Sequence, residues 1–188
     1  MKAKNIAIFE DEFLLANDLK RQLTHFGFEV SAMFAKAEDG IAYLDSLPVT
    51  EKLPDVILVD ITLAGSMSGI EAASLISEKY PCAIVFLTGM DQIQVFEKVF
   101  DEKPTAFLMK PFDIQQAIVS IQLAIYQKKL ETELNELITA RSQMRKSLEA
   151  IINLTAGISK EITNQPLLLQ YTKLLEENSM QLFSVLYG

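Results

Sequence analysis

The chain has 188 residues, of which 49% are hydrophobic, and its formal net charge is −8 at pH 7. This length suits one domain with an extension, or two small domains, and is enough to bury a real core. Residues 1–111 contain 10 Lys and Arg against 17 Asp and Glu, and residues 112–188 contain 7 against 8, so neither part has the basic surface typical of a nucleic-acid binder. The single cysteine, Cys82, excludes an internal disulfide. Because the sequence shows no signal peptide and no run of ~18 apolar residues, we expect a cytoplasmic protein without a membrane segment.

Short apolar runs alternate with amphipathic segments through the first two thirds of the chain. The apolar runs predict strands at 5–9, 28–33, 55–60, 83–88 and 105–109. The amphipathic segments predict helices at 13–26, 37–47, 69–79 and 92–100, the first with Leu14, Leu15, Leu19 and Leu23 on its inner face. Apolar runs without alternation, such as 56–59, are typical of strands buried on both faces of a parallel sheet. Strands that alternate with helices predict an α/β fold.

Polar side chains stand where four of these strands end. Glu10 and Asp11 follow the first strand, Asp60 ends the third, Thr88 ends the fourth and Lys110 follows the fifth. In open α/β sheets, ligands bind at the carboxyl ends of the strands. Clustered carboxylates suit Mg²⁺, whereas an ammonium and a hydroxyl suit phosphoryl oxygens. The set predicts a site in which Asp60 accepts a phosphoryl group while Mg²⁺ and Lys110 neutralise its charge.

Five short motifs occur in order around these residues. They are Phe-Glu-Asp-Glu at 9–12, Val-Asp-Ile-Thr-Leu at 59–63, Gly-Ile-Glu-Ala-Ala at 69–73, Leu-Thr-Gly at 87–89 and Lys-Pro-Phe at 110–112. Together they make residues 4–126 resemble the receiver domain of two-component response regulators. The resemblance implies a flavodoxin-like, five-stranded parallel sheet in the order 2-1-3-4-5.

The resemblance also implies a role for each matching residue. Asp60 is the implied phosphoacceptor, and the implied Mg²⁺ ligands are Glu10, Asp11, Asp60 and the backbone carbonyl of Thr62. Thr88 and Lys110 are expected to bind the phosphoryl group, and Lys110-Pro111 is expected to be a cis peptide. Phe107 falls at a switch position where many relatives have Tyr. The phosphoryl donor implied is a histidine kinase or a phosphotransfer protein.

Many response regulators continue into a DNA-binding domain, but here a helix-favouring segment follows. Residues 113–163 contain no proline and one glycine, Gly157. Steps of four and three residues connect Leu130, Leu134, Leu137, Arg141, Met144, Leu148, Ile151, Thr155, Ile158 and Ile162. Because eight of these ten are apolar, the pattern predicts a heptad seam that pairs with a second copy of the chain or with another partner, and we expect a homodimer. A monomeric hairpin that folds back on the receiver is the alternative. We therefore expect a receiver domain at 1–126 and a helical dimerisation segment at 127–188.

A second amphipathic helix is predicted after Pro166, so two chains could form a four-helix arrangement. Residues 145–167 also resemble the first helix of a histidine-kinase dimerisation domain, with Lys160 where that family has its phosphorylated histidine. The main interpretation is a non-enzymatic response regulator in which phosphorylation of Asp60 controls a helical dimerisation module rather than DNA binding. The alternative is a phosphotransfer or phosphatase protein that acts on another regulator through a pseudo-histidine-kinase bundle.

Overall fold

The computed structural model describes residues 4–48, 52–89, 106–161 and 166–187. The predicted helix at 92–100 lies outside the described residues. The chain divides into two compact units, Met1–Glu131 and Thr132–Gly188. No helix in the described part of the chain is long and apolar enough to cross a membrane.

The first unit contains a five-stranded sheet in which every neighbouring pair of strands is parallel. Its strands are β1 (Asn5–Phe9), β2 (Glu29–Phe34), β3 (Val56–Asp60), β4 (Ala83–Thr88) and β5 (Ala106–Met109). The strand order is β2-β1-β3-β4-β5, which confirms the predicted topology. Every residue of β1, β3 and β4 is buried, because these unbroken apolar runs lie in the middle of a sheet that is covered on both faces.

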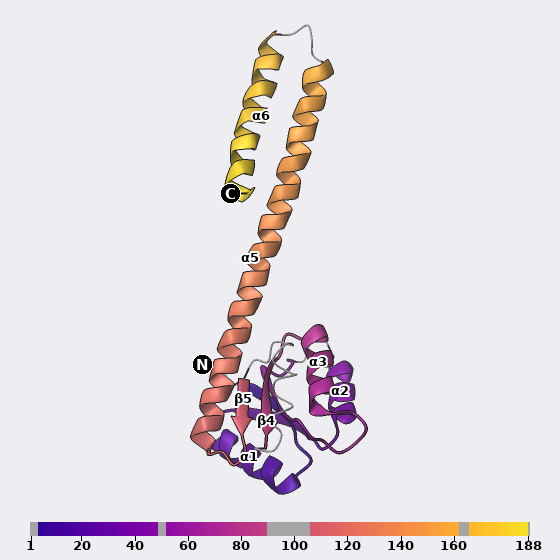
Figure 1. Cartoon of the computed structure of the whole chain (residues 1–188), viewed down its shortest axis with the longest axis vertical. Helices are drawn as coiled ribbons and strands as arrows, with labels where there is room; N and C mark the ends of the chain where they lie inside the picture. Colours follow the sequence, from indigo (N-terminus) through magenta and orange to yellow (C-terminus); the bar gives the residue numbers. More distant parts are fainter. Residues whose placement is uncertain (1–3, 49–51, 90–105, 162–165, 188) are drawn as a thin grey trace. The chain divides into compact units, whose positions relative to one another are not determined.

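Helices cover both faces of this sheet (Figure 1). They are α1 (Phe13–His25), α2 (Ala37–Ser46), α3 (Gly69–Lys79) and the first part of α5 (Ile114–Glu161). Phe9, Ile57 and Phe86 pack under α2 and α3 on one face. Ile8, Leu58 and Val85 and their neighbours pack against α1 and α5 on the other. Parallel strands therefore end at one shared edge, with a hydrophobic core on each side.

The inner face of α1 differs from the predicted one at a single position. Leu19 and Leu23 are buried as predicted, but Leu14 is 76% exposed and Ala16 is buried instead. A period of 3.6 residues puts positions 16, 19 and 23 on one face, whereas position 14 lies about 200° around the helix from position 16. The prediction for Leu14 was therefore wrong.

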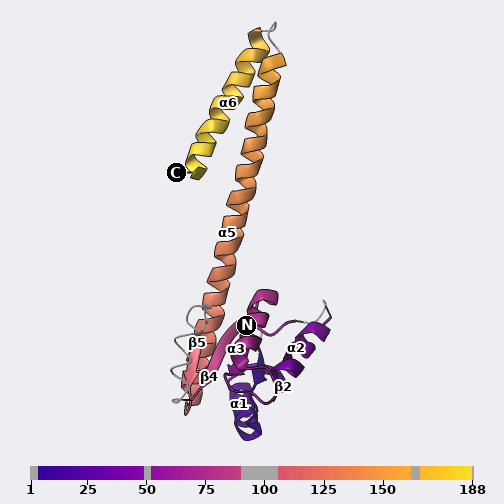
Figure 2. The same cartoon turned by 45° about the vertical axis from the view of Figure 1, so that its right-hand side comes forward.

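The second unit contains the C-terminal part of α5 and helix α6 (Pro166–Tyr187), which lie side by side in both views (Figures 1 and 2). The helix predicted from residue 113 is thus confirmed as one continuous element of 48 residues. Pro166 occupies the first position of α6, where its fixed φ suits a helix start and no N–H bond is lost.

Candidate functional site

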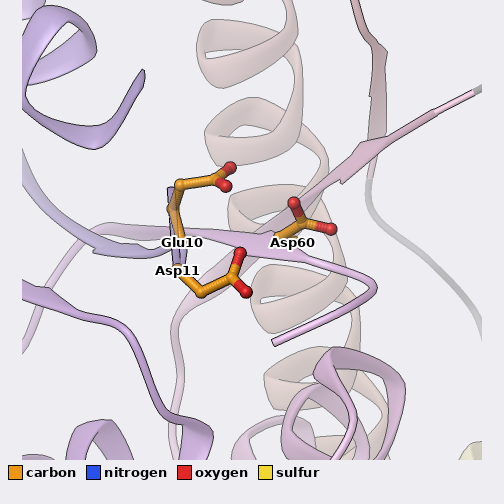
Figure 3. A group of neighbouring side chains, drawn as sticks. All are labelled: Glu10, Asp11 and Asp60. Atoms are coloured by element: carbon orange, nitrogen blue, oxygen red, sulfur yellow. The ribbon is translucent and has the colours of Figure 1, made fainter. Parts of the chain in front are cut away.

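Three carboxylates converge at the carboxyl-terminal edge of the sheet (Figure 3). Glu10 and Asp11 directly follow β1, and Asp60 is the last residue of β3. One carboxylate oxygen from each residue lies within 4.8 Å of the others. Glu10 and Asp60 are buried, whereas Asp11 is exposed, so the cluster is open to solvent beside Asp11. Closely spaced, anionic oxygen donors of this kind fit Mg²⁺.

The Lys110 ammonium connects two of these carboxylates. Its Nζ lies 2.7 Å from Oε2 of Glu10 and also contacts Oδ2 of Asp60. Lys110 directly follows β5, and its backbone N–H donates to the Thr88 carbonyl at 2.7 Å. Burial lowers the pKa of Lys110, but the hydrogen bonds to Asp60 and Glu10 outweigh burial and leave that pKa above its ordinary value. The lysine therefore brings a permanent positive charge to the candidate phosphoacceptor.

Glu10 is the most strongly perturbed group in the cluster. Burial, with a smaller contribution from the neighbouring Asp60 charge, raises the pKa of Glu10 to about 7 against the opposing hydrogen bond from Lys110. The lysine alone therefore does not neutralise two buried carboxylates. A divalent cation beside them would supply the missing positive charge, so the electrostatics and the donor atoms both fit Mg²⁺.

The backbone that follows Asp60 turns back against it. The N–H of Thr62 donates to Oδ1 of Asp60 at 2.9 Å, and the N–H of Gly69 donates to the carbonyl of Ile61 at 3.0 Å. A Cβ atom on Gly69 would lie 1.8 Å from the carbonyl oxygen of Asp60. Only glycine therefore allows α3 to begin so close to the end of β3. The predicted role of the Thr62 carbonyl as a metal ligand stays a prediction.

Thr88, predicted to bind the phosphoryl group, and Phe107, the predicted switch residue, lie on the adjacent strands β4 and β5. Thr88 ends β4, which pairs with β3 as far as Asp60. The Thr88 side chain is fully buried. Phe107 pairs with Phe86 across β4 and β5, and the two rings stack with their centroids 5.6 Å apart. Thr88 and Phe107 therefore lie on neighbouring strands, with Thr88 paired to Met109, two positions after Phe107.

The structure thus gathers Glu10, Asp11, Asp60 and Lys110 in one cluster, with the cis peptide Lys110-Pro111 that the resemblance implies. Glu38 in α2, which no sequence motif singled out, binds the loop that follows Asp60 through its carboxylate. Its partners include backbone N–H groups, and a sequence pattern does not reveal such partners. An acidic residue in the first turn of a helix is also common for a different reason, its favourable interaction with the helix dipole.

In a comparison with known families, residues 6–122 match the response regulator receiver domain. The transcriptional regulatory protein PdtaR of Mycobacterium tuberculosis is 33% identical over 122 residues, which are 65% of this chain and 57% of PdtaR. The DNA-binding transcriptional regulator NtrC of Klebsiella pneumoniae is 29% identical over 119 residues, which are 63% of this chain and 24% of NtrC. The chain therefore matches only part of the length of these relatives.

Solved structures show the same fold. The signal receiver domain of a modulated diguanylate cyclase from Desulfovibrio desulfuricans is similar with a TM-score of 0.61 and 31% identity, over 69% of this chain and 98% of that one. A structure described as an adenylate cyclase from Rhodopirellula baltica is similar with a TM-score of 0.62 and 27% identity, over 73% of this chain and 98% of that one.

Proposed function

This chain belongs to the response regulator receiver family, and from that membership we propose that Mg²⁺-dependent phosphorylation of Asp60 switches its receiver, which then signals through the C-terminal helices. The observation that carries the proposal is the double contact of Lys110 with Glu10 and Asp60 beside the exposed Asp11. The contact puts a nucleophilic carboxylate, a fixed cation and a set of Mg²⁺ ligands in one place. We propose a histidine kinase or a phosphotransfer protein as the phosphoryl donor.

The transfer we propose exchanges one bond to phosphorus for another. A carboxylate oxygen of Asp60 forms a bond to phosphorus, and the bond between phosphorus and the donor histidine nitrogen breaks. The electron pair of that bond stays on the imidazole nitrogen, which takes up a proton from solvent. Glu10, Asp11 and Asp60 would hold Mg²⁺, which supplies positive charge for the phosphoryl oxygens. Lys110 then shifts its hydrogen bonds from the carboxylates to the new anion.

The response we propose inside the receiver runs through Thr88. A phosphoryl group on Asp60 attracts the Thr88 hydroxyl, because a phosphoryl oxygen is a strong acceptor. Movement of Thr88 at the end of β4 changes the space available to Phe107 on β5. Phe107 has no hydroxyl, so its switched position is stabilised by packing alone.

We propose that the C-terminal hairpin of α5 and α6 pairs with the hairpin of a second chain. Within this hairpin, the buried residues include Leu148 and three polar residues, Thr155, Thr172 and Ser179. Large apolar side chains remain exposed on both helices: Leu137, Met144, Ile151, Leu154 and Ile158 on α5, and Leu168, Tyr171, Leu174, Leu175 and Leu182 on α6. An apolar surface of this extent indicates a protein interface. A second copy offers the same surface, and the small charge of residues 112–188 adds little repulsion.

Phosphorylation itself is tested with the whole chain, Mg²⁺ and a small phosphoryl donor such as phosphoramidate. We expect intact-mass spectrometry to show one added phosphoryl group, lost in Asp60→Asn and in the absence of Mg²⁺. An unmodified wild-type protein, or equal modification of Asp60→Asn, contradicts the proposed function.

A further inference from the structure

Glu38, a carboxylate outside the acidic cluster, binds the loop between β3 and α3. Its Oε1 accepts hydrogen bonds from the backbone N–H of Ser66 at 2.9 Å, the Ser66 hydroxyl at 2.7 Å and the N–H of Met67 at 3.0 Å. Glu38 lies in the first turn of α2, 28 residues before Ser66 in the chain. One carboxylate oxygen thereby holds two consecutive backbone amides of the loop, so it restrains the backbone and not only a side chain.

The loop is shaped around this carboxylate. Gly65 has a φ of +114°, and a Cβ atom there would lie 2.7 Å from Oε2 of Glu38. A backbone bridge between Lys36 and Ala64 joins the same two segments just before this contact. The conformation of Gly65 favours glycine, and a side chain there would displace the Glu38 carboxylate from its present position. Both features keep the loop close to the start of α2.

The Glu38 contact is maintained over a wide pH range. Hydrogen bonds from the Ser66 hydroxyl and from backbone N–H groups lower the pKa of Glu38 to about 2. The carboxylate is therefore charged at every pH at which Glu10 and Asp60 could bind Mg²⁺. A charged acceptor makes stronger hydrogen bonds than a neutral one, which suits a group that fixes a loop.

The opposite end of this loop contacts the candidate site. Thr62, two residues after Asp60, donates its N–H to the Asp60 carboxylate, and Ile61 and Gly69 close the base of the loop. Only Leu63 separates Thr62 from the Ala64–Met67 segment that Lys36 and Glu38 hold. Thr62 is therefore held on one side by the Asp60 carboxylate and on the other side by the segment that Lys36 and Glu38 bind.

We propose that Glu38 is a positioning residue for Mg²⁺ binding and phosphorylation at Asp60, because it fixes the loop that carries Thr62. This inference rests on the proposed function. Groups that orient metal ligands without touching the metal commonly change metal affinity by about 10- to 100-fold when they are removed. Because Glu38 contacts backbone atoms of the loop, its removal should change the geometry of the Mg²⁺ site and not the charge of that site.

The test is Mg²⁺ titration calorimetry on the whole chain for wild type, Glu38→Ala, Glu38→Gln and Glu71→Ala. Glu71 is a matched control, because its Oε2 accepts the N–H and the hydroxyl of Ser68, both at 2.8 Å, at the far end of the same loop. We expect Glu38→Ala to bind Mg²⁺ about tenfold more weakly. Glu38→Gln keeps an acceptor oxygen and should recover most of the affinity, and Glu71→Ala should match the wild type.

Phosphoramidate kinetics give a second readout. For Glu38→Ala we expect slower phosphorylation of Asp60 at low Mg²⁺ and a rate near that of the wild type at saturating Mg²⁺. If Glu38→Ala does not fold, Ser66→Ala removes one of the three hydrogen bonds and should show a smaller loss of affinity in the same direction.

Two results would overturn the inference: unchanged Mg²⁺ affinity in a folded Glu38→Ala, or an equal loss of affinity in Glu71→Ala, which would indicate general loosening. Failure of the proposed function looks different, because the wild type itself would then bind no Mg²⁺ or accept no phosphoryl group.

Discussion

The Lys110 ammonium lies 2.7 Å from a carboxylate oxygen of Glu10, although 100 positions separate the two residues in the chain. The parallel sheet accounts for this contact, because the carboxyl ends of β1 and β5 lie on one edge with β3 and β4 between them. The same ammonium contacts Asp60, so a single cation serves two buried carboxylates. We therefore expect the stability of the site and its Mg²⁺ affinity to depend on this shared contact.

Replacement of Lys110 by Met should destabilise the Mg²⁺-free protein by about 2 kcal/mol at pH 8, because both carboxylates lose their cation while the partly exposed site keeps some hydration. Added Mg²⁺ should restore more stability to Lys110→Met than to the wild type. Thermal unfolding with and without Mg²⁺ measures both effects. The control is Lys79→Met, which removes an exposed pair with Asp45 and should destabilise the protein much less than Lys110→Met does. Equal losses in the two variants would show that the shared contact contributes nothing special.

Mg²⁺ affinity should rise with pH up to about 7 and then level off, because burial raises the pKa of Glu10 to about 7 and the metal binds the ionised form. A carboxyl with a raised folded-state pKa contributes stability that is complete below its unfolded-state pKa and is lost as pH rises through about 7. Mg²⁺ should therefore stabilise the fold more at pH 8 than at pH 6. Calorimetry at a series of pH values checks this.

The control for the pH profile is Glu10→Gln, which should bind Mg²⁺ more weakly and with a flatter profile between pH 6 and 8. A wild-type affinity that stays constant across that interval contradicts the assignment of the titration to Glu10.

Gly69→Ala should destabilise the receiver by about 3 kcal/mol, because the new Cβ would lie 1.8 Å from the Asp60 carbonyl oxygen and α3 would have to move. The movement should also weaken Mg²⁺ binding. Gly157→Ala is the matched control, since nothing lies within 4 Å of a Cβ there, and it should stabilise helix α5 by up to about 1 kcal/mol. Urea unfolding of both variants gives the comparison, and a neutral Gly69→Ala would contradict the close approach of α3 to β3.

Much of the receiver could be predicted because its signals are local. Unbroken apolar runs indicate buried parallel strands, and the carboxylates at their ends indicate the site. The bounds predicted for residues 69–79 and 83–88 match α3 and β4. The Ser68 capping box explains the first of these matches, because Ser68 and Glu71 satisfy each other's backbone N–H at the start of α3.

The missed features depend on contacts between distant segments. Leu14 has the composition of a core residue, but the rotation of α1 is set by which face packs best on the sheet. Glu38 binds backbone amides in a loop that the sequence places 28 residues away. In the tail, Leu148 and Thr155 belong to the predicted seam, yet they are buried while Met144 and Ile151 of the same seam are exposed. A heptad pattern alone does not distinguish a face covered by α6 from one that needs another chain.

Loading Asp60 with beryllofluoride and Mg²⁺ should shift the NMR signals of Phe107 and of Phe86, which stacks on it. The reason is the proposed movement of Thr88 at the end of β4. Phe26, at the end of α1, should not shift, and Asp60→Asn should abolish the change. If Phe107 is unaffected while Asp60 is saturated, the switch does not run through β5.

We expect the whole chain to form a dimer in solution, and light scattering with Mg²⁺ present tests this. The wild type should have twice the mass of one chain. The double variant Met144→Glu and Ile151→Glu should be monomeric, because a symmetric interface would bring its new charges close to those of the other copy. Leu75→Glu is the matched control, since Leu75 is a similarly exposed apolar residue on α3 of the receiver, and this variant should remain a dimer.

A wild type that is dimeric with and without beryllofluoride indicates a constitutive dimer that phosphorylation rearranges. A monomer that dimerises on addition of beryllofluoride makes Asp60 the assembly switch. A monomer in both states refutes the second copy as the occupant of the apolar surface.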